Sequence, residues 1–224
     1  MKTQARVRGV HELVEIPFGS RKLNGILTVP HDARGIVLFA HGSGSGRLSP
    51  RNQNVAGVLQ QAGMATVLFD LLDEEEAEDR AKVFDIELLA QRLEVAAVWT
   101  QEREETRGLR LGYFGASTGA AAALVATARQ GKTVKAVVSR GGRPDLAKDS
   151  LPLVQAPTLL VVGGNDEPVI DLNQRALAKL RCEKQLTIVP GATHLFPEPG
   201  ALEEVARLAS EWFQRYLAVH ELSH

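Results

Sequence analysis

The residue with the clearest chemical potential in this chain is Ser117, in the stretch GYFGASTGAAAALV at 112–125. An apolar run ends at this serine, and Gly115 and Gly119 stand two residues to either side of it. The G-x-S-x-G pattern is typical of a sharp strand-to-helix turn that presents a serine nucleophile. A serine hydroxyl is a weak nucleophile at neutral pH, so it needs a base, which a third group must orient.

Two other interpretations of the same stretch remain open at this point. Small residues also begin ordinary helices, in which case Ser117 has no chemical role. Gly112, Gly115 and Gly119 resemble a loose version of a dinucleotide-binding glycine turn. The turn lies in the middle of the chain rather than in a first βαβ unit, and the chain has no Tyr-x-x-x-Lys pair. Both features disfavour dinucleotide binding.

Candidates for the base and for the group that orients it follow two later apolar runs. LLVVGGNDEPV ends in a turn with Asp166, and LTIVPGATHLF leads to His194. The chain order serine, aspartate, histidine is that of the α/β-hydrolase arrangement. A lone strand-end Asp usually caps a helix, and a lone His is usually structural. The three together predict a triad of Ser117, Asp166 and His194.

Acyl transfer also needs two N–H donors for the negatively charged oxygen of the tetrahedral intermediate. The backbone N–H of Thr118, directly after the nucleophile, is one candidate. The other should come from the loop FAHGSGSGRLSPRN, where we expect the N–H of Ser43, with Gly44 as the adjacent alternative. This loop lacks the Gly-Lys-Ser/Thr ending of a phosphate-binding loop. We expect His41 to be a structural hydrogen-bonding residue beneath it.

Four arginines follow strands at the same predicted edge. Two interpretations stay open: they tie loops to backbone carbonyls or to Asp145 and Asp149, or some of them bind an anionic group of the substrate. The four are Arg47, Arg51, Arg140 and Arg143.

The pattern of apolar runs predicts the elements that position these residues. Segments 11–18 and 22–30 predict an antiparallel hairpin. Six further strands are expected at 35–42, 65–72, 109–117, 134–142, 157–166 and 186–194. Helices are expected at 54–62, 85–105, 119–130, 171–180 and 201–218. The alternation predicts an α/β domain over 1–224, with a mostly parallel eight-stranded sheet and helices on both faces.

Two connections bear on access to the site. The acidic run 73–79 is expected to be an exposed loop rather than a metal site. The connection 141–156 is short, which leaves little room for a large lid. We therefore expect an open site.

Composition excludes several classes of partner. The 26 Lys and Arg residues are scattered and the net charge is −1, so no nucleic-acid partner is expected. The opening residues lack the apolar core of a signal peptide, and no run approaches the roughly 20 apolar residues of a membrane span. A cytoplasmic protein, monomeric or a small homo-oligomer, is expected. Cys182 has no His or Cys neighbour for a metal or redox role, and no metal or cofactor is expected.

The motifs HGSGSGR, GASTG, GGNDEPV and GATH, in this order, resemble the α/β-hydrolase superfamily, and within it the compact, lidless dienelactone-hydrolase-like branch. The resemblance covers nearly the whole chain and implies acyl transfer to serine followed by hydrolysis, without a cofactor. Dienelactone hydrolases use a cysteine nucleophile, whereas this chain has Ser117. That departure puts a dienelactone substrate in doubt.

The expected function is a serine hydrolase that cleaves small or medium acyl esters through an acyl-enzyme on Ser117. A thioesterase or acyltransferase using the same triad is an alternative, because water and another acceptor compete for one acyl-enzyme. An α/β-hydrolase-fold binding protein without catalysis is a second alternative.

Overall fold

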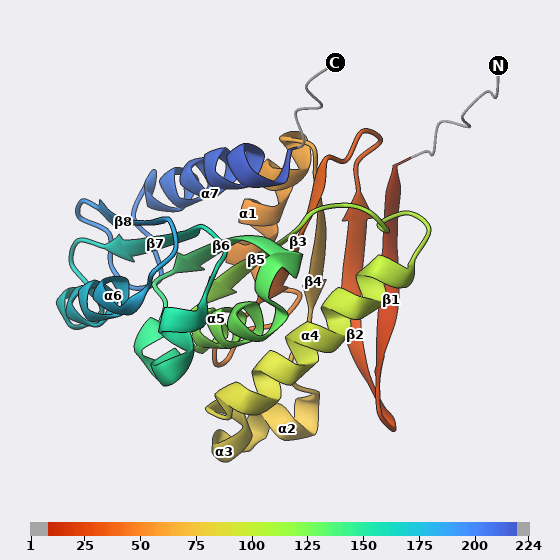
Figure 1. Cartoon of the computed structure of the whole chain (residues 1–224), viewed down its shortest axis with the longest axis horizontal. Helices are drawn as coiled ribbons and strands as arrows, with labels where there is room; N and C mark the ends of the chain where they lie inside the picture. The colour runs from red at the N-terminus through yellow and green to blue at the C-terminus, as the bar shows by residue number, and fades with distance from the viewer. Residues whose placement is uncertain (1–8, 219–224) are drawn as a thin grey trace.

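The computed structural model describes residues 9–218, and its eight strands form a single sheet (Figure 1). Their order across the sheet is β1-β2-β4-β3-β5-β6-β7-β8. The strands are β1 (Val10–Phe18), β2 (Arg21–Val29), β3 (Gly35–Ala40), β4 (Met64–Phe69), β5 (Leu111–Ala116), β6 (Val134–Arg140), β7 (Thr158–Gly163) and β8 (Lys184–Val189).

The sheet is antiparallel only at its leading edge. β1 pairs antiparallel with β2, and β2 pairs antiparallel with β4. All other pairings are parallel. This confirms the predicted eight-stranded, mostly parallel sheet with a leading hairpin. The chain passes from β3 to β4 on one side and then crosses to β5 on the other. Ligands of open α/β sheets bind outside the carboxyl ends of the strands at such a switch point.

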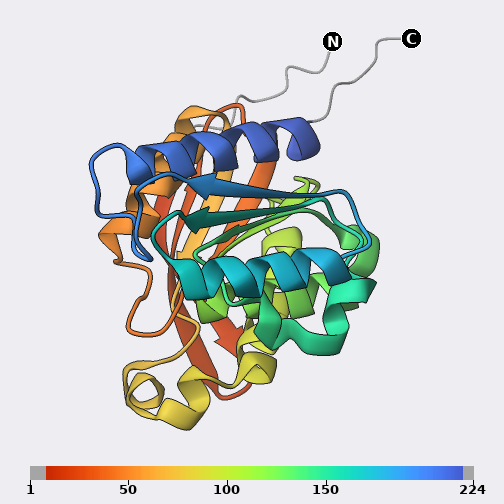
Figure 2. The same ribbon diagram turned by 90° about the vertical axis from the view of Figure 1, so that its left-hand side faces the viewer.

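Helices cover both faces of the sheet, as predicted. α1 (Pro50–Gln61) and α7 (Ala201–Leu217) lie on one face, whereas α4 (Ile86–Glu102), α5 (Thr118–Gln130) and α6 (Glu167–Lys179) lie on the other (Figures 1 and 2). Each face has its own cluster of buried apolar side chains. Because they are covered on both faces, β3, β4, β5 and β7 are buried along their whole length.

The prediction of an exposed loop at 73–79 is wrong, because most of this acidic run is helical. It forms α2 (Glu74–Glu78), followed directly by α3 (Arg80–Val83). Asp73 accepts a hydrogen bond from the backbone N–H of Glu76, and the Glu76 side chain accepts one from the N–H of Asp73, which is a capping box. The connection 141–156 likewise contains a 3-10 segment at Pro144–Leu153.

Glu76 is the buried exception in this acidic run. Its carboxylate accepts two hydrogen bonds from the Arg92 guanidinium of α4, at 2.6 and 2.8 Å, and both side chains are almost fully buried. Arg92 also donates to the carbonyl of Leu71 and lies over the Phe18 ring. The hydrogen bonds from Arg92 lower the pKa of Glu76 to about 2. The pair therefore fastens α2 and the residues before it to α4.

The first eight residues, in which no signal-peptide core is expected, lie outside the described range. Within residues 9–218, no helix is both long enough and apolar enough to cross a membrane.

Glu76→Gln should lower the free energy of unfolding by about 3–5 kcal/mol, because it leaves a buried guanidinium without its counter-charge. The pKa of Glu76 is lower in the folded chain than its ordinary 4.5, so its stabilisation is complete above about pH 4.5. It is lost as the pH falls toward about 2. Urea unfolding measured between pH 7 and pH 2 tests both points.

The matched control is Glu75→Gln, which alters an exposed carboxylate of the same helix. This variant should change the free energy of unfolding by no more than about 0.5 kcal/mol. Equal losses in the two variants would contradict the role assigned to the Glu76–Arg92 pair.

Candidate active site

Ser117 lies at the junction of β5 and α5 in a strained backbone conformation, with φ 50° and ψ −122°. A non-glycine residue with positive φ costs of order 1–3 kcal/mol and persists only where its surroundings enforce it. Here the enforcement is close packing. A Cβ at Gly115 would lie 2.5 Å from the Cα of Ala120, and a Cβ at Gly119 would overlap the carbonyl oxygens of Ala40 and His41. The turn therefore has the geometry of a nucleophile elbow.

Asp166 and His194 are joined directly. Asp166 follows β7 at the start of α6, and His194 lies in the loop after β8. The His194 Nδ1 is 2.6 Å from the Asp166 Oδ2, and the aspartate is the more buried partner. When Nδ1–H donates to the carboxylate, the neutral imidazole carries its lone pair on Nε2. His194 is thus held in the tautomer that a general base requires.

The end of β6 connects this pair to the serine. The N–H of Ser117 donates to the Arg140 carbonyl at 3.4 Å, and the N–H of Arg143 donates to the Ser117 carbonyl at 3.0 Å. A Cβ at Gly141 would lie 3.6 Å from the His194 Cε1. Ser117 and His194 therefore flank the same strand end. Among the hydrogen bonds of residues 9–218, none joins Ser117 to His194, and such bonds often tighten only when substrate binds.

The loop after β3 lies against the serine turn. A Cβ at Gly42 would lie 2.8 Å from the Ser117 Cβ and 3.5 Å from its Oγ. In the part of the chain that the structure describes, the backbone N–H groups of Ser43 and Thr118 have no hydrogen-bond acceptor. Gly44, the adjacent candidate, adopts φ 66°. The two predicted donors thus come from loops in contact and remain available.

His41 has the structural role expected for it. Its Nε2 accepts a hydrogen bond from the N–H of Leu71 at 2.8 Å, and its Nδ1 donates to the Gly42 carbonyl at 3.0 Å. Burial lowers the pKa of His41, which favours the neutral ring that both bonds require. His41 therefore joins the loop after β3 to the end of β4.

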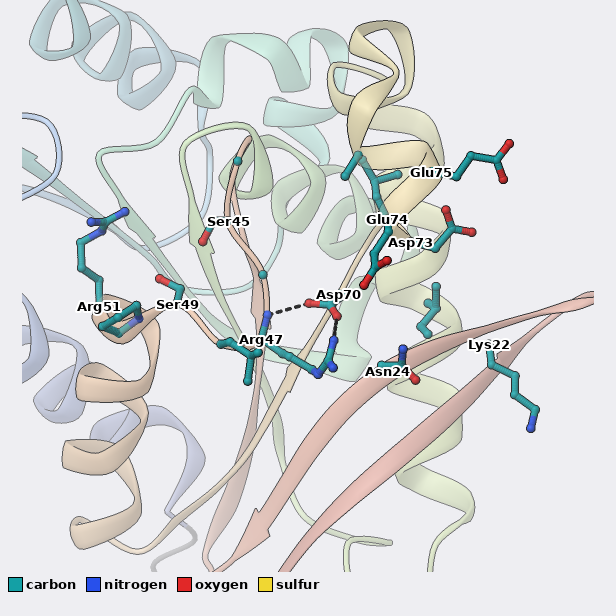
Figure 3. Close-up of a pocket in the computed structure, with 17 residues that line it drawn as sticks. Lys22, Asn24, Ser45, Arg47, Ser49, Arg51, Asp70, Asp73, Glu74 and Glu75 are labelled. Carbon is teal, nitrogen blue, oxygen red and sulfur yellow. Dashed lines mark hydrogen bonds and ion pairs between the residues drawn. The ribbon is translucent and has the colours of Figure 1, made fainter.

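The four arginines divide into two pairs. Arg143 donates two hydrogen bonds to Asp145, at 2.9 and 2.8 Å. Arg47 pairs with Asp70 through both its guanidinium and its backbone N–H, rather than with Asp145 or Asp149 (Figure 3). Arg51 and Arg140, in contrast, form no ion pair with any described residue.

Two hollows adjoin the site. A cavity of about 110 Å³ lies between the loop after β3 and the helices α2 to α4. Its lining includes Thr118 and the apolar side chains of Leu72, Val83 and Leu89. A larger cleft of about 680 Å³ shares Gly44, Ser45, Leu72 and Ala77 with it (Figure 3). This apolar wall could not be foreseen from a predicted exposed loop at 73–79, because it is formed where α2, α3 and α4 pack together.

Gly119→Ala should lower the free energy of unfolding by about 1–3 kcal/mol, because the added methyl group overlaps the backbone at the end of β3. Gly57→Ala in α1 is the matched control, since a Cβ there meets nothing within 4 Å. It should instead raise the free energy of unfolding by about 0.5–1 kcal/mol. Urea unfolding of both variants measures these changes. An unchanged free energy of unfolding in Gly119→Ala would contradict the close packing of the turn.

Comparison with known proteins supports the fold and gives the family. Residues 24–219 match the model of the dienelactone hydrolase family. The crystal structure of dienelactone hydrolase from Anabaena variabilis ATCC 29413 is 58% identical and superposes with a TM-score of 0.90, over 94% of this chain and all of that one. Est1E from Butyrivibrio proteoclasticus, in its complex with ferulic acid, has the same fold. Its TM-score is 0.80 at 17% identity, over 92% of this chain and 100% of that one.

Relatives in Mycobacterium tuberculosis extend well beyond this match. "Putative phosphoribosyl transferase Rv0571c" from strain ATCC 25618 / H37Rv is 60% identical over 206 residues, which is 92% of this chain. The chain spans only 46% of that relative's length. The name therefore describes a protein of which more than half lies outside the match. From the family model and the shared fold, the chain belongs to the dienelactone hydrolase family.

Proposed function

We propose that this chain is a serine hydrolase of small or medium acyl esters. Ser117 is the nucleophile, His194 is the general base, and Asp166 is the carboxylate that orients the imidazole of His194. One observation carries the proposal: a strained serine turn and a hydrogen-bonded Asp–His pair flank the same end of β6. Family membership and the shared hydrolase fold support it independently.

Each proton and each bond of ester hydrolysis can be accounted for with these residues, the ester and water. The Ser117 Oγ attacks the ester carbonyl carbon while its proton passes to the His194 Nε2. The carbonyl oxygen becomes an oxyanion, which the N–H groups of Ser43 and Thr118 stabilise, with Gly44 as the adjacent donor. The carbon–oxygen bond to the alcohol then breaks, and the alcohol takes the proton from Nε2. Water, deprotonated by His194, releases the acid and restores Ser117.

The two sides of the ester have different surroundings. The leaving alcohol must reach the His194 Nε2 to be protonated. The 110 Å³ cavity contains the candidate oxyanion donors in its lining, but none of its ten lining residues comes from the loop of His194. We therefore assign this cavity to the acyl group. Its size favours short acyl chains.

Two alternatives use the same fold. A thioesterase or acyltransferase would form the same acyl-enzyme, and product analysis with added thiols, alcohols or amines separates it from a hydrolase. A binding protein without catalysis would leave Ser117 unreactive. The phosphoribosyl transferase name belongs to relatives of which the match covers only 46%, so it is not carried over to this chain.

A fluorophosphonate probe tests the nucleophile without knowledge of the substrate. We expect one adduct per chain on Ser117, detected by intact mass and peptide mapping. It should be absent in Ser117→Ala and strongly slowed in His194→Ala, because the serine then lacks its base. Turnover of a simple acetyl ester should fall in parallel.

Ser20→Ala is the control, since Ser20 is an exposed serine in the turn between β1 and β2 and lines neither the 110 Å³ cavity nor the larger cleft. It should label like the unaltered protein. An adduct at another residue, or labelling that survives in Ser117→Ala, would contradict the assignment. Circular dichroism of each variant ensures that lost labelling does not reflect an unfolded chain.

Ala77→Phe should shift the preferred acyl chain toward acetyl, because Ala77 is an exposed lining residue common to the cavity and the larger cleft. We expect kcat/KM for a hexanoyl ester to fall about tenfold relative to the acetyl ester of the same alcohol. Leu89→Ala, which enlarges the cavity, should shift the preference the other way. An unchanged chain-length profile in both variants would contradict the acyl assignment of this cavity.

A further inference from the structure

The imidazole of His194 is only partly enclosed by protein. Its side chain is 39% exposed, and among residues 9–218 the ring forms one hydrogen bond, which joins Nδ1 to the Asp166 carboxylate. A ring that is held at one atom can still turn about that bond. The direction of Nε2, the atom that must reach Ser117, therefore depends on the backbone that carries the side chain.

His194 is a central residue of a tight turn. The N–H of Phe196 donates to the Thr193 carbonyl at 3.1 Å, which closes a β-turn over residues 193–196. Phe196 has φ 55°, a conformation that is strained for a bulky side chain. It is nevertheless only 2% exposed and belongs to the apolar cluster on the α1 and α7 face of the sheet. Burial of the Phe196 ring thus fixes the end of the turn.

Glu198 fixes the beginning of the same turn. Its carboxylate accepts a hydrogen bond from the Thr193 N–H at 3.1 Å and another from the Thr193 hydroxyl at 2.6 Å. The bond from the hydroxyl, more than any other contact, lowers the pKa of Glu198, so the acceptor is ionised at neutral pH. Hydrogen bonds to an ionised acceptor are stronger than those to a neutral one. The Glu198 carbonyl also accepts the N–H of Ala201, the first residue of α7, at 3.0 Å. Glu198 therefore fastens the residue before His194 to the start of α7.

The two residues before the turn are fastened separately. The N–H of Asn165 donates to the Ala192 carbonyl at 2.9 Å, and its side-chain amide donates to the Gly191 carbonyl at 2.9 Å. Asn165 directly precedes Asp166, so these bonds join the loop after β8 to the loop that carries the aspartate. They stop short of Thr193, whose side chain is bonded by Glu198 among the described residues.

We propose that Glu198 is a positioning residue for the general base: by holding Thr193 it orders the turn of His194 and directs the imidazole toward Ser117. Glu198 acts through the turn and touches neither the substrate nor the reacting atoms. The effect on catalysis rests on the proposed function, whereas the ordering of the His194 ring does not. A base that points in the wrong direction weakens the transition state more than substrate binding, so its loss lowers kcat and leaves KM nearly unchanged.

Variants on both sides of the Thr193–Glu198 contact test the proposal. Glu198→Ala removes both hydrogen bonds, and Thr193→Val removes the bond from the hydroxyl. Each should lower kcat for a simple acetyl ester, and the rate of fluorophosphonate labelling, by about tenfold or more. Thr193→Ser keeps both donors and should restore kcat to within about twofold of the unaltered protein. Equal loss in Thr193→Ser and Thr193→Val would overturn the proposal.

Three controls separate positioning from charge and from general damage. The double variant of Thr193→Val and Glu198→Ala should be no slower than Glu198→Ala alone, because both changes remove the same contact. Glu203→Ala removes an exposed carboxylate from the first turn of α7 and should keep kcat within about twofold. In Glu198→Ala the plateau of labelling rate against pH should fall while its midpoint stays in place. A shifted midpoint with an unchanged plateau would mean that the carboxylate acts through its charge, which overturns the proposal.

Nuclear magnetic resonance of the full chain with isotope-labelled histidine separates failure of this proposal from failure of the proposed function. The Nδ1–H signal of His194, assigned by its absence in His194→Ala, reports the bond to Asp166 without any turnover. We expect it to broaden or disappear in Glu198→Ala and in Thr193→Val. That result supports the positioning role even if no ester is cleaved. An unaltered signal in both variants overturns it, even if activity falls. Thr193 is exposed, so Thr193→Val provides a folded variant if Glu198→Ala is unstable.

Discussion

The close approach of the serine turn to the end of β3 is the constraint on which the site depends. A side chain at Gly119 has no room beside the carbonyls of Ala40 and His41, and the same packing holds Ser117 at positive φ. It also brings the loop of Ser43 against Ser117. The proposed nucleophile and the proposed oxyanion donors are therefore positioned by backbone packing between neighbouring strands, at the switch point of the sheet.

Buried charges are satisfied differently on the two sides of the serine turn. The buried Glu76–Arg92 pair fastens α2 over an apolar cavity, where carboxylate and guanidinium satisfy each other. At the end of β6, Arg140 is buried with no such partner. The two sides of the serine turn thus differ in how their buried charges are satisfied.

Much of this arrangement could be predicted because it follows from local pattern. Parallel strands place their carboxyl ends at one edge, so strand-end residues such as Ser117, Asp166 and His194 had to lie near one another. Arg143 and Asp145 are only two positions apart in the chain, and Asp145 was one of the partners predicted for the arginines. The partner of Arg47 and the burial of Arg140 depend on packing between distant segments, which periodicity does not report. The Asp73 to Glu76 spacing carried a capping signal, but the burial of Glu76 requires Arg92 from another helix.

In the proposed mechanism, Ser117 carries the acyl group during turnover. Rapid quenching of the reaction with a slowly hydrolysed acetyl ester, followed by mass spectrometry, observes that intermediate directly. We expect the chain to gain the mass of one acetyl group in the first turnover, peptide mapping to place this group on Ser117, and the group to be lost at the rate of product release. Ester hydrolysis with no acetyl group on Ser117 at any time would contradict it.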